Sequence, residues 1–342
     1  MNIEQELQAE IIVEIGNTHE GSVGIAQCFI EMAANAGAKI IKFQMHIAEK
    51  EGIENEPFRV KFSAQDKTRQ EYWRRINFKV EDWIYLAEYC RKLNVEFLCT
   101  PFSIDSAKVL LENNLVKRWK VGSGQATDLP LIDYLISTKM PLIISTGLIS
   151  EKEISLLKNR LINAHAWDRT TLMHCVSKYP VPITEIDLPL MKSLKSLGCK
   201  VGYSDHSGSE IVIYSAITMG ASIIEVHMTP RPDFFGPDVS SSHTPEQISR
   251  IVSFAKIYPQ LATTARTKDE HFESVAELRK LFRKGIYWAK NKKSGEMVEL
   301  SDLHFLKPVG EVDVIDFEKF LGKRVSRDVE INSPLRYSDF SI

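Results

Sequence analysis

The sequence has little that would direct the protein to a membrane, to nucleic acid or out of the cell. No apolar run approaches the roughly 20 residues of a membrane-spanning helix, and the N-terminal stretch MNIEQELQAE is acidic and lacks the apolar core of a signal peptide. The 43 basic and 45 acidic residues leave a net charge of −2, so no overall positive field favours nucleic acid. These absences predict a cytoplasmic protein that binds neither membrane nor nucleic acid.

Cysteine is also sparse. The five cysteines lack the close pairs of a zinc site and the density of a disulfide scaffold. They are Cys28, Cys90, Cys99, Cys175 and Cys199. Each lies among apolar or amphipathic residues, so we expect reduced cysteines in the core.

Short apolar runs recur eight times in the first three quarters of the chain, and each suits a strand buried on both faces. They are residues 11–16, 39–44, 95–100, 118–123, 141–146, 171–176, 200–205 and 222–227. Segments with helical spacing separate them. Strict alternation of this length predicts an α/β fold, a (β/α)₈ TIM barrel, over residues 1–262. The alternative is an open doubly wound sheet, but the first turn, GNTHEGS, lacks the glycine fingerprint of a dinucleotide site.

Three further segments differ from this alternation. Residues 45–80 contain many charged residues and show no regular spacing of apolar ones. A connection of this length is expected to cover part of the active face. Residues 263–280 are polar and unperiodic, which indicates a linker arm. Residues 281–342 alternate short β-like runs with turn signals, which predicts a small β-rich domain.

The residues that end the eight predicted strands are polar, and in a (β/α)₈ barrel these positions form the active site. Two of them are lysines, Lys42 and Lys120. Hydroxyl and amide side chains accompany the lysines: Gln44, Thr100, Ser123, Gln125, Ser145, Ser177, Tyr179 and Ser204. A pocket of this composition suits a small anionic substrate with phosphate and carboxylate groups. The alternative is that both lysines are solvated charges at the rim.

His206 and His227 end neighbouring strands at the same height, a geometry that suits a metal ion. Two histidines leave the coordination shell open to water or substrate, as a catalytic ion requires. Two core histidines are the alternative. His174 has no partner in register, and we expect a structural role for it.

Two acidic residues are candidates for the reaction. Glu20 ends a glycine-bounded loop above the first strand and is an acid/base candidate, although it equally suits a cap for the helix that begins near Ser22. Asp238, in GPDVSSSH, lies on a loop that can reach hydroxyls of a polyol, but loop aspartates often only form turns.

Ten short motifs in order resemble the sialic acid synthase family over almost the whole chain. They are EIGNTHEGS, IKFQ, LCTPF, KVGSGQ, IISTG, HCVSKYP, GYSDHS, EVH, GPD and FLGKRV. The resemblance implies a phosphoenolpyruvate-dependent synthase of nine-carbon nonulosonic acids. It also implies a barrel joined to an antifreeze-like (SAF) domain, in a homodimer where that domain covers the partner's barrel.

The implied reaction joins phosphoenolpyruvate to the open-chain aldehyde of an N-acetylated hexose such as N-acetylmannosamine and releases phosphate. The implied cofactor is a divalent metal, commonly Mn²⁺, with Mg²⁺ or Co²⁺ as alternatives. The positions that match the family's phosphoenolpyruvate site are Lys42, Thr100, Lys120, Ser123, Ser145, Ser177 and Ser204. Those that match its acceptor site are Glu20, Gln44, Gln125, Tyr179, Asp238 and Lys307. His206 and His227 match the metal ligands, and the implied catalytic residues are Glu20, Lys42, Lys120 and His206.

Three of these positions depart from the pattern of the bacterial family members. Ser177 stands where asparagine is usual, Gln125 where glutamate is usual, and Lys307 where arginine is usual. Glutamine lacks a charge, and lysine lacks the planar fork of arginine. The departures leave the acceptor open. The alternatives are another aldehyde sugar, which would give a different 3-deoxy-ulosonate, and a sugar-binding barrel without catalysis.

Overall fold

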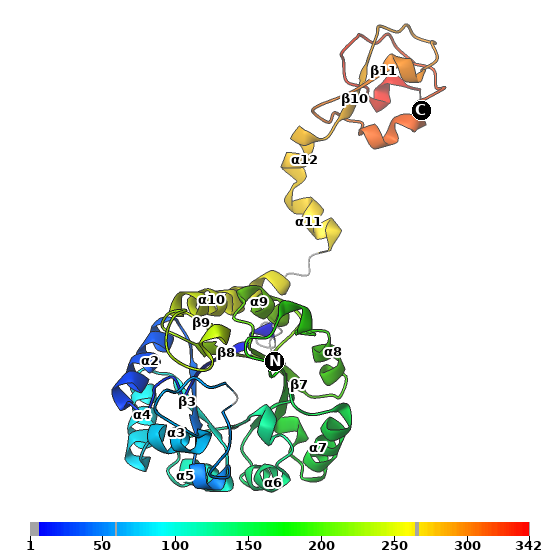
Figure 1. Ribbon diagram of the computed structural model, residues 1–342. Coiled ribbons are helices and arrows are strands. Elements are labelled where there is room, and N and C mark those ends of the chain that lie inside the picture. The colour runs from blue at the N-terminus through cyan, green and yellow to red at the C-terminus, as the bar shows by residue number, and fades with distance from the viewer. Residues whose placement is uncertain (1–6, 59, 264–266, 342) are drawn as a thin grey trace. The chain divides into compact units, whose positions relative to one another are not determined.

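The computed structural model describes residues 7–58, 60–263 and 267–341, and the chain divides into two compact units, residues 1–263 and 264–342. The first unit contains eight parallel strands, each followed in sequence by a helix that packs outside them (Figure 1). The strands are β1 (Glu10–Gly16), β2 (Ile40–Met45), β3 (Glu96–Pro101), β4 (Trp119–Val121), β5 (Leu142–Ser145), β6 (Thr170–His174), β7 (Lys200–Asp205) and β8 (Ile223–Met228). The outer helices are α2 (Val23–Asn35), α4 (Val80–Lys92), α5 (Ile104–Glu112), α6 (Leu129–Ser137), α7 (Glu151–Asn163), α8 (Leu190–Lys195), α9 (Glu210–Thr218) and α10 (Pro245–Ala262).

The strands form a nearly closed barrel. Hydrogen bonds join them in the order β3-β2-β1-β8-β7-β6-β5-β4, and β3 and β4, at the two ends of this order, contact each other. A two-residue strand, β9 (Ser242–His243), pairs with β8 outside the main order. The predicted (β/α)₈ barrel is therefore confirmed, and the open doubly wound sheet is wrong.

Side chains alternate along each strand, and this alternation builds the barrel interior in layers. Ile11, Val13 and Ile15 of β1 pack in the large core outside the strands. A separate apolar cluster contains Ile12, Ile40, Leu98, Ile143, Met173 and Ile223. The residues two positions further along the same six strands are mostly polar: Glu14, Lys42, Thr100, Ser145, Cys175 and Glu225. A polar layer thus lies above an apolar one, toward the carboxyl ends of the strands.

Capping residues set the starts of two of the outer helices. The Ser150 side chain accepts from the Glu153 amide at the start of α7, and Thr244 accepts from the Gln247 amide at the start of α10. Each pair forms a capping box, which satisfies amide groups that have no partner within the helix.

The cysteines are all free, but they are not all core residues. Cys90, Cys99 and Cys175 are buried, Cys199 is half-buried and Cys28 is exposed. The core prediction is therefore wrong for Cys28, which lies on α2 beside the buried Phe29 and Ala26 but on the outer face of that helix.

The long connection between β2 and α4 has a small core of its own. It contains a 3-10 helix, η1 (Ala48–Lys50), and a short helix, α3 (Arg69–Ile76). The buried residues Ala48, Tyr72, Trp73 and Ile76 pack together, and Phe58 and Phe62 pack against them. This core fixes a segment whose sequence showed little periodicity.

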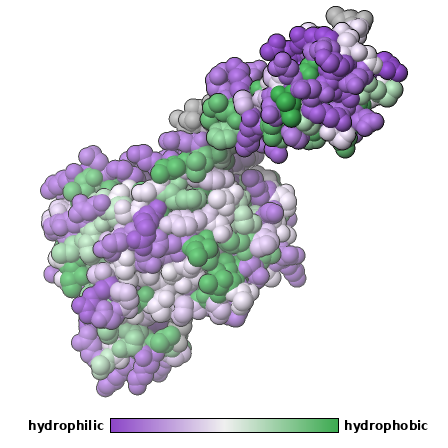
Figure 2. Space-filling view, turned by 90° about the horizontal axis from the view of Figure 1, so that it is seen from above, coloured by the Kyte–Doolittle hydropathy of each residue, from purple (hydrophilic) through white to green (hydrophobic). Residues whose placement is uncertain are grey.

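The second unit has a separate apolar core around Trp288 and Leu335. Two short helices, α11 (Lys268–Ser274) and α12 (Ala276–Phe282), occupy most of the segment predicted as a linker arm. A two-stranded antiparallel sheet, β10 (Gly285–Trp288) and β11 (Leu303–Leu306), follows them. Hydrophilic residues dominate the face of this unit that Figure 2 shows. No helix among the described residues is both long enough and apolar enough to cross a bilayer.

Candidate active site

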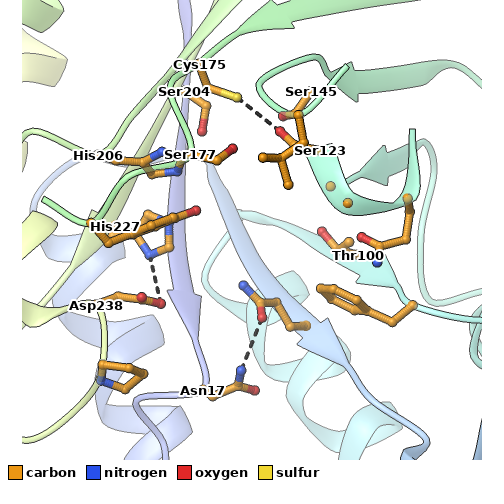
Figure 3. Close-up of a pocket in the computed structure, with 18 of the residues that line it drawn as sticks. Asn17, Thr100, Ser123, Ser145, Cys175, Ser177, Ser204, His206, His227 and Asp238 are labelled. Atoms are coloured by element: carbon orange, nitrogen blue, oxygen red, sulfur yellow. Dashed lines mark hydrogen bonds and ion pairs between the residues drawn. The ribbon is translucent and has the colours of Figure 1, made fainter. Parts of the chain in front are cut away.

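A cavity of about 430 Å³ opens at the carboxyl ends of the barrel strands, a volume within the range of small-molecule sites. The strand-end residues that line it are Asn17, Lys42, Gln44, Thr100, Lys120, Ser123, Gln125, Ser145, Cys175, Ser177, Tyr179, Ser204, His206, Glu225, His227 and Asp238. In Figure 3, His206 and His227 lie on one side of the cavity, and Ser123, Ser145 and Thr100 lie on the other. The structure thus brings together most of the residues that the sequence singled out.

Four ionisable side chains form the charged floor of the barrel mouth: Glu14, Lys42, Lys120 and Glu225. All four are buried, with exposed fractions from 1 to 4%. The Lys42 ammonium forms an ion pair with Glu14 and lies 3.7 Å from Glu225 Oε2. The Lys120 ammonium lies 3.5 Å from Glu225 Oε1. The two ammonium groups are therefore held in place by two carboxyl groups, although burial lowers the pKa of Lys120 despite Glu225.

Burial and these ion pairs shift the pKa values of the charged floor. Burial alone would raise the pKa of Glu225, but attraction to Lys120 and Lys42 outweighs it and lowers the pKa to about 2. Burial raises the pKa of the Glu14 carboxyl despite Lys42. Burial would lower the pKa of Lys42, but Glu14 and Glu225 raise it. Glu225 is thus an anion at neutral pH and holds Lys42 in its charged form.

Hydroxyl groups surround the two lysines. Lys42 Nζ donates to Thr100 Oγ1 at 3.1 Å, and Lys120 Nζ donates to Ser145 Oγ at 2.8 Å. Ser204 Oγ donates to Glu225 Oε1 at 3.1 Å. Ammonium groups accompanied by hydroxyls offer several donors to the oxygens of a phosphate or carboxylate.

Gly147 fixes the position of another of these hydroxyls. Its amide donates to Ser123 Oγ at 3.1 Å, and the same oxygen lies 3.2 Å from Cys175 Sγ. A Cβ atom at Gly147 would lie 2.7 Å from both Cys175 Sγ and Ser177 Oγ, closer than real contacts allow. Only glycine fits between these strand ends.

His206 and His227 meet on neighbouring strands, as the sequence predicted, with ring centroids 5.5 Å apart. Burial lowers the pKa of both rings, to about 4 for His206, so both are neutral at neutral pH. His206 Nδ1 lies 2.8 Å from the Val176 carbonyl oxygen, which fixes Nδ1 as the donor and leaves Nε2 with its lone pair. Neutral imidazoles with a free nitrogen are in the form that binds metal ions.

These histidines have few protein groups to complete a metal site. The described residues contain no group of three His, Cys, Asp or Glu side chains close enough to hold a metal ion. Asp238 is the nearest carboxylate, with Oδ2 3.8 Å from His227 Nδ1. The pair therefore fits an ion only if water or substrate supplies the other ligands.

Glu20 is not among the described residues that line the cavity. Both of its carboxylate oxygens accept hydrogen bonds from the β2–α4 connection: Tyr72 donates at 2.8 Å and Arg75 at 2.9 Å. The cap of α2 comes from Ser22, which accepts from the Ile25 amide. The acid/base role of Glu20 stays a prediction.

Two other predicted residues have different surroundings. His174 Nε2 bonds to the Ile186 carbonyl oxygen at 2.8 Å, which agrees with a structural role. Lys307 belongs to the second unit, where its ammonium lies 5.5 Å from the centre of the Phe282 ring. Its role at an acceptor site stays a prediction.

Sequence reasoning missed Glu14 and gave Glu225 no role. Both lie two residues after an inward-facing isoleucine, Ile12 and Ile223, just as Lys42 follows Ile40. Each is an acidic residue at a position of a buried strand that faces the barrel interior, and this placement is the signal that would have identified them. The aromatic residues of the β2–α4 connection follow no such regular spacing in the sequence.

Comparisons with known proteins agree with this architecture. The profile of the NeuB family matches residues 29–266. The N,N'-diacetyllegionaminic acid synthase of Campylobacter jejuni subsp. jejuni is 28% identical over 335 residues, covering 95% of this chain and 98% of that protein. The pseudaminic acid synthase of Helicobacter pylori is 25% identical over 334 residues, covering 96% of this chain and 97% of that protein.

A solved structure shares the fold. The N-acetylneuraminic acid (sialic acid) synthetase of Leptospira borgpetersenii superposes with a TM-score of 0.68 at 26% identity, over 79% of this chain and 92% of that chain. The fold and the strand-end pocket define a (β/α)₈-barrel enzyme. The chain belongs to the NeuB family, and it is a phosphoenolpyruvate-dependent ulosonic acid synthase.

Proposed function

We propose that the protein condenses phosphoenolpyruvate with the open-chain aldehyde of an N-acetylated, N-acetylmannosamine-like hexose to form a nonulosonic acid, with release of phosphate. The observation that carries this proposal is the charged floor, where two buried lysines stand among hydroxyls at the base of a small-molecule cavity. The names of the relatives, legionaminic and pseudaminic acid synthases, support the product class.

Phosphoenolpyruvate would bind with its anionic groups on Lys42 and Lys120. Thr100 and Ser145 already bond to these ammonium groups and can direct their own hydroxyls to the same oxygens. Because the floor excludes water, electrostatic attraction there is stronger than in solution. The lysines then stabilise the negative charge of the reacting phosphate.

The proposed reaction makes one carbon–carbon bond and one carbon–oxygen bond, the latter to water, and breaks the carbon–oxygen bond to phosphate. Carbon three of phosphoenolpyruvate attacks the aldehyde carbon, and the aldehyde oxygen takes up a proton to become a hydroxyl. Water then adds to the cationic carbon two and loses a proton. Phosphate leaves from the resulting tetrahedral carbon, which becomes the ketone of the product.

His206 and His227 would hold a divalent metal such as Mn²⁺, and the bound ion would polarise the aldehyde. The neutral rings and the fixed tautomer of His206 support this assignment. Tyr179 packs against His206 with ring centroids 4.1 Å apart and ring planes tilted by 34°, so it helps to orient that ring.

The second unit would serve as an antifreeze-like domain in a homodimer. No residue of α11 or α12 is buried within its own unit, and α12 exposes Leu278, Leu281 and Phe282. Exposed apolar side chains on a short arm favour contact with another surface. If Lys307 acts in the partner's pocket, mixing inactive Lys307→Ala and His206→Ala chains should restore activity in part; no recovery would contradict a shared site.

Phosphate release from phosphoenolpyruvate, measured with Mn²⁺ and a panel of aldehyde sugars, tests the proposal. Release that depends on an N-acetylated hexose is expected. Release only with sugars that lack the acetamido group would instead favour synthesis of another 3-deoxy-ulosonate. Binding of sugars without release of phosphate would instead indicate a sugar-binding barrel without catalysis.

The metal assignment has a readout of its own. His206→Ala should lose bound Mn²⁺ in equilibrium dialysis as well as turnover, because it removes one of only two protein ligands. His174→Ala is the matched control, since that ring is buried in the same barrel but bonds to a backbone carbonyl. Full Mn²⁺ binding by His206→Ala would contradict the assignment.

A further inference from the structure

A buried histidine to which the proposed chemistry gives no role lies directly behind the cavity. His46 follows the last residue of β2 and is 3% exposed. Its ring stacks on Trp73 with centroids 3.8 Å apart and planes 3° apart, and on Phe102 with centroids 4.1 Å apart. Trp73 and Phe102 line the cavity, as does Gln44, which His46 also contacts. His46 itself is not among the described lining residues, so it can act on the cavity only through these neighbours.

Both ring nitrogens of His46 face oxygen atoms. Nδ1 lies 2.7 Å from Glu51 Oε2, and Nε2 lies 3.2 Å from Gln44 Oε1. A carboxylate oxygen and an amide oxygen accept hydrogen bonds and do not donate them. The ring therefore satisfies both contacts only when each nitrogen carries a proton, and in that form the ring is positively charged.

The other partners of the Gln44 amide fix its orientation. Gln44 Nε2 donates to Glu14 Oε1 at 2.6 Å, so Gln44 Oε1 is the atom that faces His46. The same oxygen accepts from Asn17 Nδ2 at 3.1 Å (Figure 3). The Gln44 side chain is thus held at its nitrogen by the charged floor and at its oxygen by Asn17 and His46.

The immediate surroundings of His46 stabilise a positive charge. Glu51 places one carboxylate oxygen on the ring, and its other oxygen accepts from the Ile47 amide at 2.6 Å, which holds the carboxylate in position. The faces of aromatic rings attract a cation, and His46 stacks on Trp73 and Phe102.

The other titratable groups near His46 are neutral or paired. Burial, and to a smaller extent His46, lowers the pKa of His19 to about 3, so His19 carries no charge at neutral pH. Charged residues on the segments around His46 form ion pairs of their own: Arg69–Glu56, Arg74–Glu49, Arg74–Glu54, Arg75–Asp66 and Lys50–Asp105. Glu51 is therefore the carboxylate that the ring pairs with.

We propose that His46 is a positioning residue for acceptor binding: its doubly protonated ring holds the Gln44 amide and the Trp73 ring in place, and loss of one proton weakens acceptor binding. The inference rests on the proposed function, because Gln44 is a position expected to contact the acceptor. A neutral ring can donate to Glu51 or to Gln44 but not to both, so one of the two contacts must break. Phosphoenolpyruvate, which would bind on the two lysines of the floor, should not respond to this change.

The test follows the KM of each substrate and the charge of the His46 ring against pH, with the full-length protein and Mn²⁺. Phosphate release gives the KM values, with the N-acetylated hexose that the wild type turns over fastest as the acceptor. Nitrogen NMR of histidine-labelled protein follows the ring, and His46→Gln identifies its signal by the loss of that signal. We expect the acceptor KM to rise about tenfold as the ring loses its second proton, the effect of losing one hydrogen bond to a charged group. The KM for phosphoenolpyruvate should show no step at that midpoint.

Two variants separate a positioning role from a merely structural one. His46→Gln should raise the acceptor KM and remove this step from its pH dependence, because glutamine does not titrate. Glu51→Gln should move the midpoint of both the NMR and the KM curves to lower pH, because the charged ring loses its anionic partner. His174→Gln is the matched control, since that buried ring bonds to a backbone carbonyl, and it should leave the pH dependence of the acceptor KM unchanged.

The outcomes separate this inference from the proposed function. The same pH dependence of the acceptor KM in wild type and His46→Gln would overturn the inference while the synthase reaction stands. An unchanged midpoint in Glu51→Gln, or an equal rise of both KM values in His46→Gln, would overturn it as well. No phosphate release from the wild type with any N-acetylated hexose would overturn the proposed function, and this inference with it.

Discussion

The charged floor of the cavity and its aromatic wall, which consists of Phe58, Phe62, Tyr72 and Trp73, are built in different ways. The floor takes its side chains from regular strands, where Glu14 lies opposite Lys42 and Glu225 lies opposite Ile12. The wall takes its side chains from one irregular connection between β2 and α4. The backbone ladder of the barrel fixes the floor, whereas the short helix α3 and the packing of side chains around it fix the wall.

The difference separates two tasks. A rigid floor suits the substrate charges, because preorganised ammonium groups stabilise charge without rearrangement. A wall held by side chains can change without disturbing the barrel, which suits selection among acceptors. Mutations in the floor should therefore affect the chemistry itself, and mutations in the wall should affect the choice of sugar.

The largest effect is expected for Lys42→Met in the floor. Loss of one preorganised charge should lower kcat by about 10²- to 10³-fold. Steady-state phosphate release measures this loss, and circular dichroism checks that the variant is folded. Lys117→Met, at an exposed position before β4, is the control. A kcat near that of the wild type would show that Lys42 is not part of the reaction.

The next effect concerns the response of the floor to acid. The folded-state pKa of Glu225, about 2, lies below its ordinary value of 4.5. A lowered carboxyl pKa stabilises the fold above pH 4.5, and this contribution is lost as the pH falls toward 2. Wild type should therefore lose unfolding free energy over this range, measured by urea denaturation, and Glu225→Gln should lose less. Parallel losses in the two proteins would contradict the ionised floor.

The smallest effect is expected for Tyr72→Phe in the wall. This change removes only the hydrogen bond to Glu20 and should cost about 1 kcal/mol of unfolding free energy. The KM for the acceptor should rise, and the KM for phosphoenolpyruvate should not. Tyr214→Phe, which removes a tyrosine–glutamate hydrogen bond on α9, is the matched control. A rise in the KM for phosphoenolpyruvate would show that wall and floor are not separable.

Much of the barrel could be predicted because its signals are local. A strand needs an apolar run, and a helix needs a periodic face with a cap such as Ser150, and both are visible within about 15 residues. Lys42, Lys120, His206 and His227 could be named because (β/α)₈ barrels place the ends of their strands at one mouth. Glu14 could not be named in this way, because it lies within a strand and only the alternation of inward-facing and outward-facing side chains reveals its position.

The sequence by itself determined the eight strands, their polar ends and the pairing of two histidines on neighbouring strands. Only the tertiary structure decided the partners of Glu20, which are Tyr72 and Arg75, 52 and 55 residues further along the chain. Only the tertiary structure, likewise, assembled Phe58, Phe62 and Trp73 into one surface. The physical reason is that strand pairing repeats a regular backbone pattern, whereas side-chain packing between distant segments follows no period that a sequence displays.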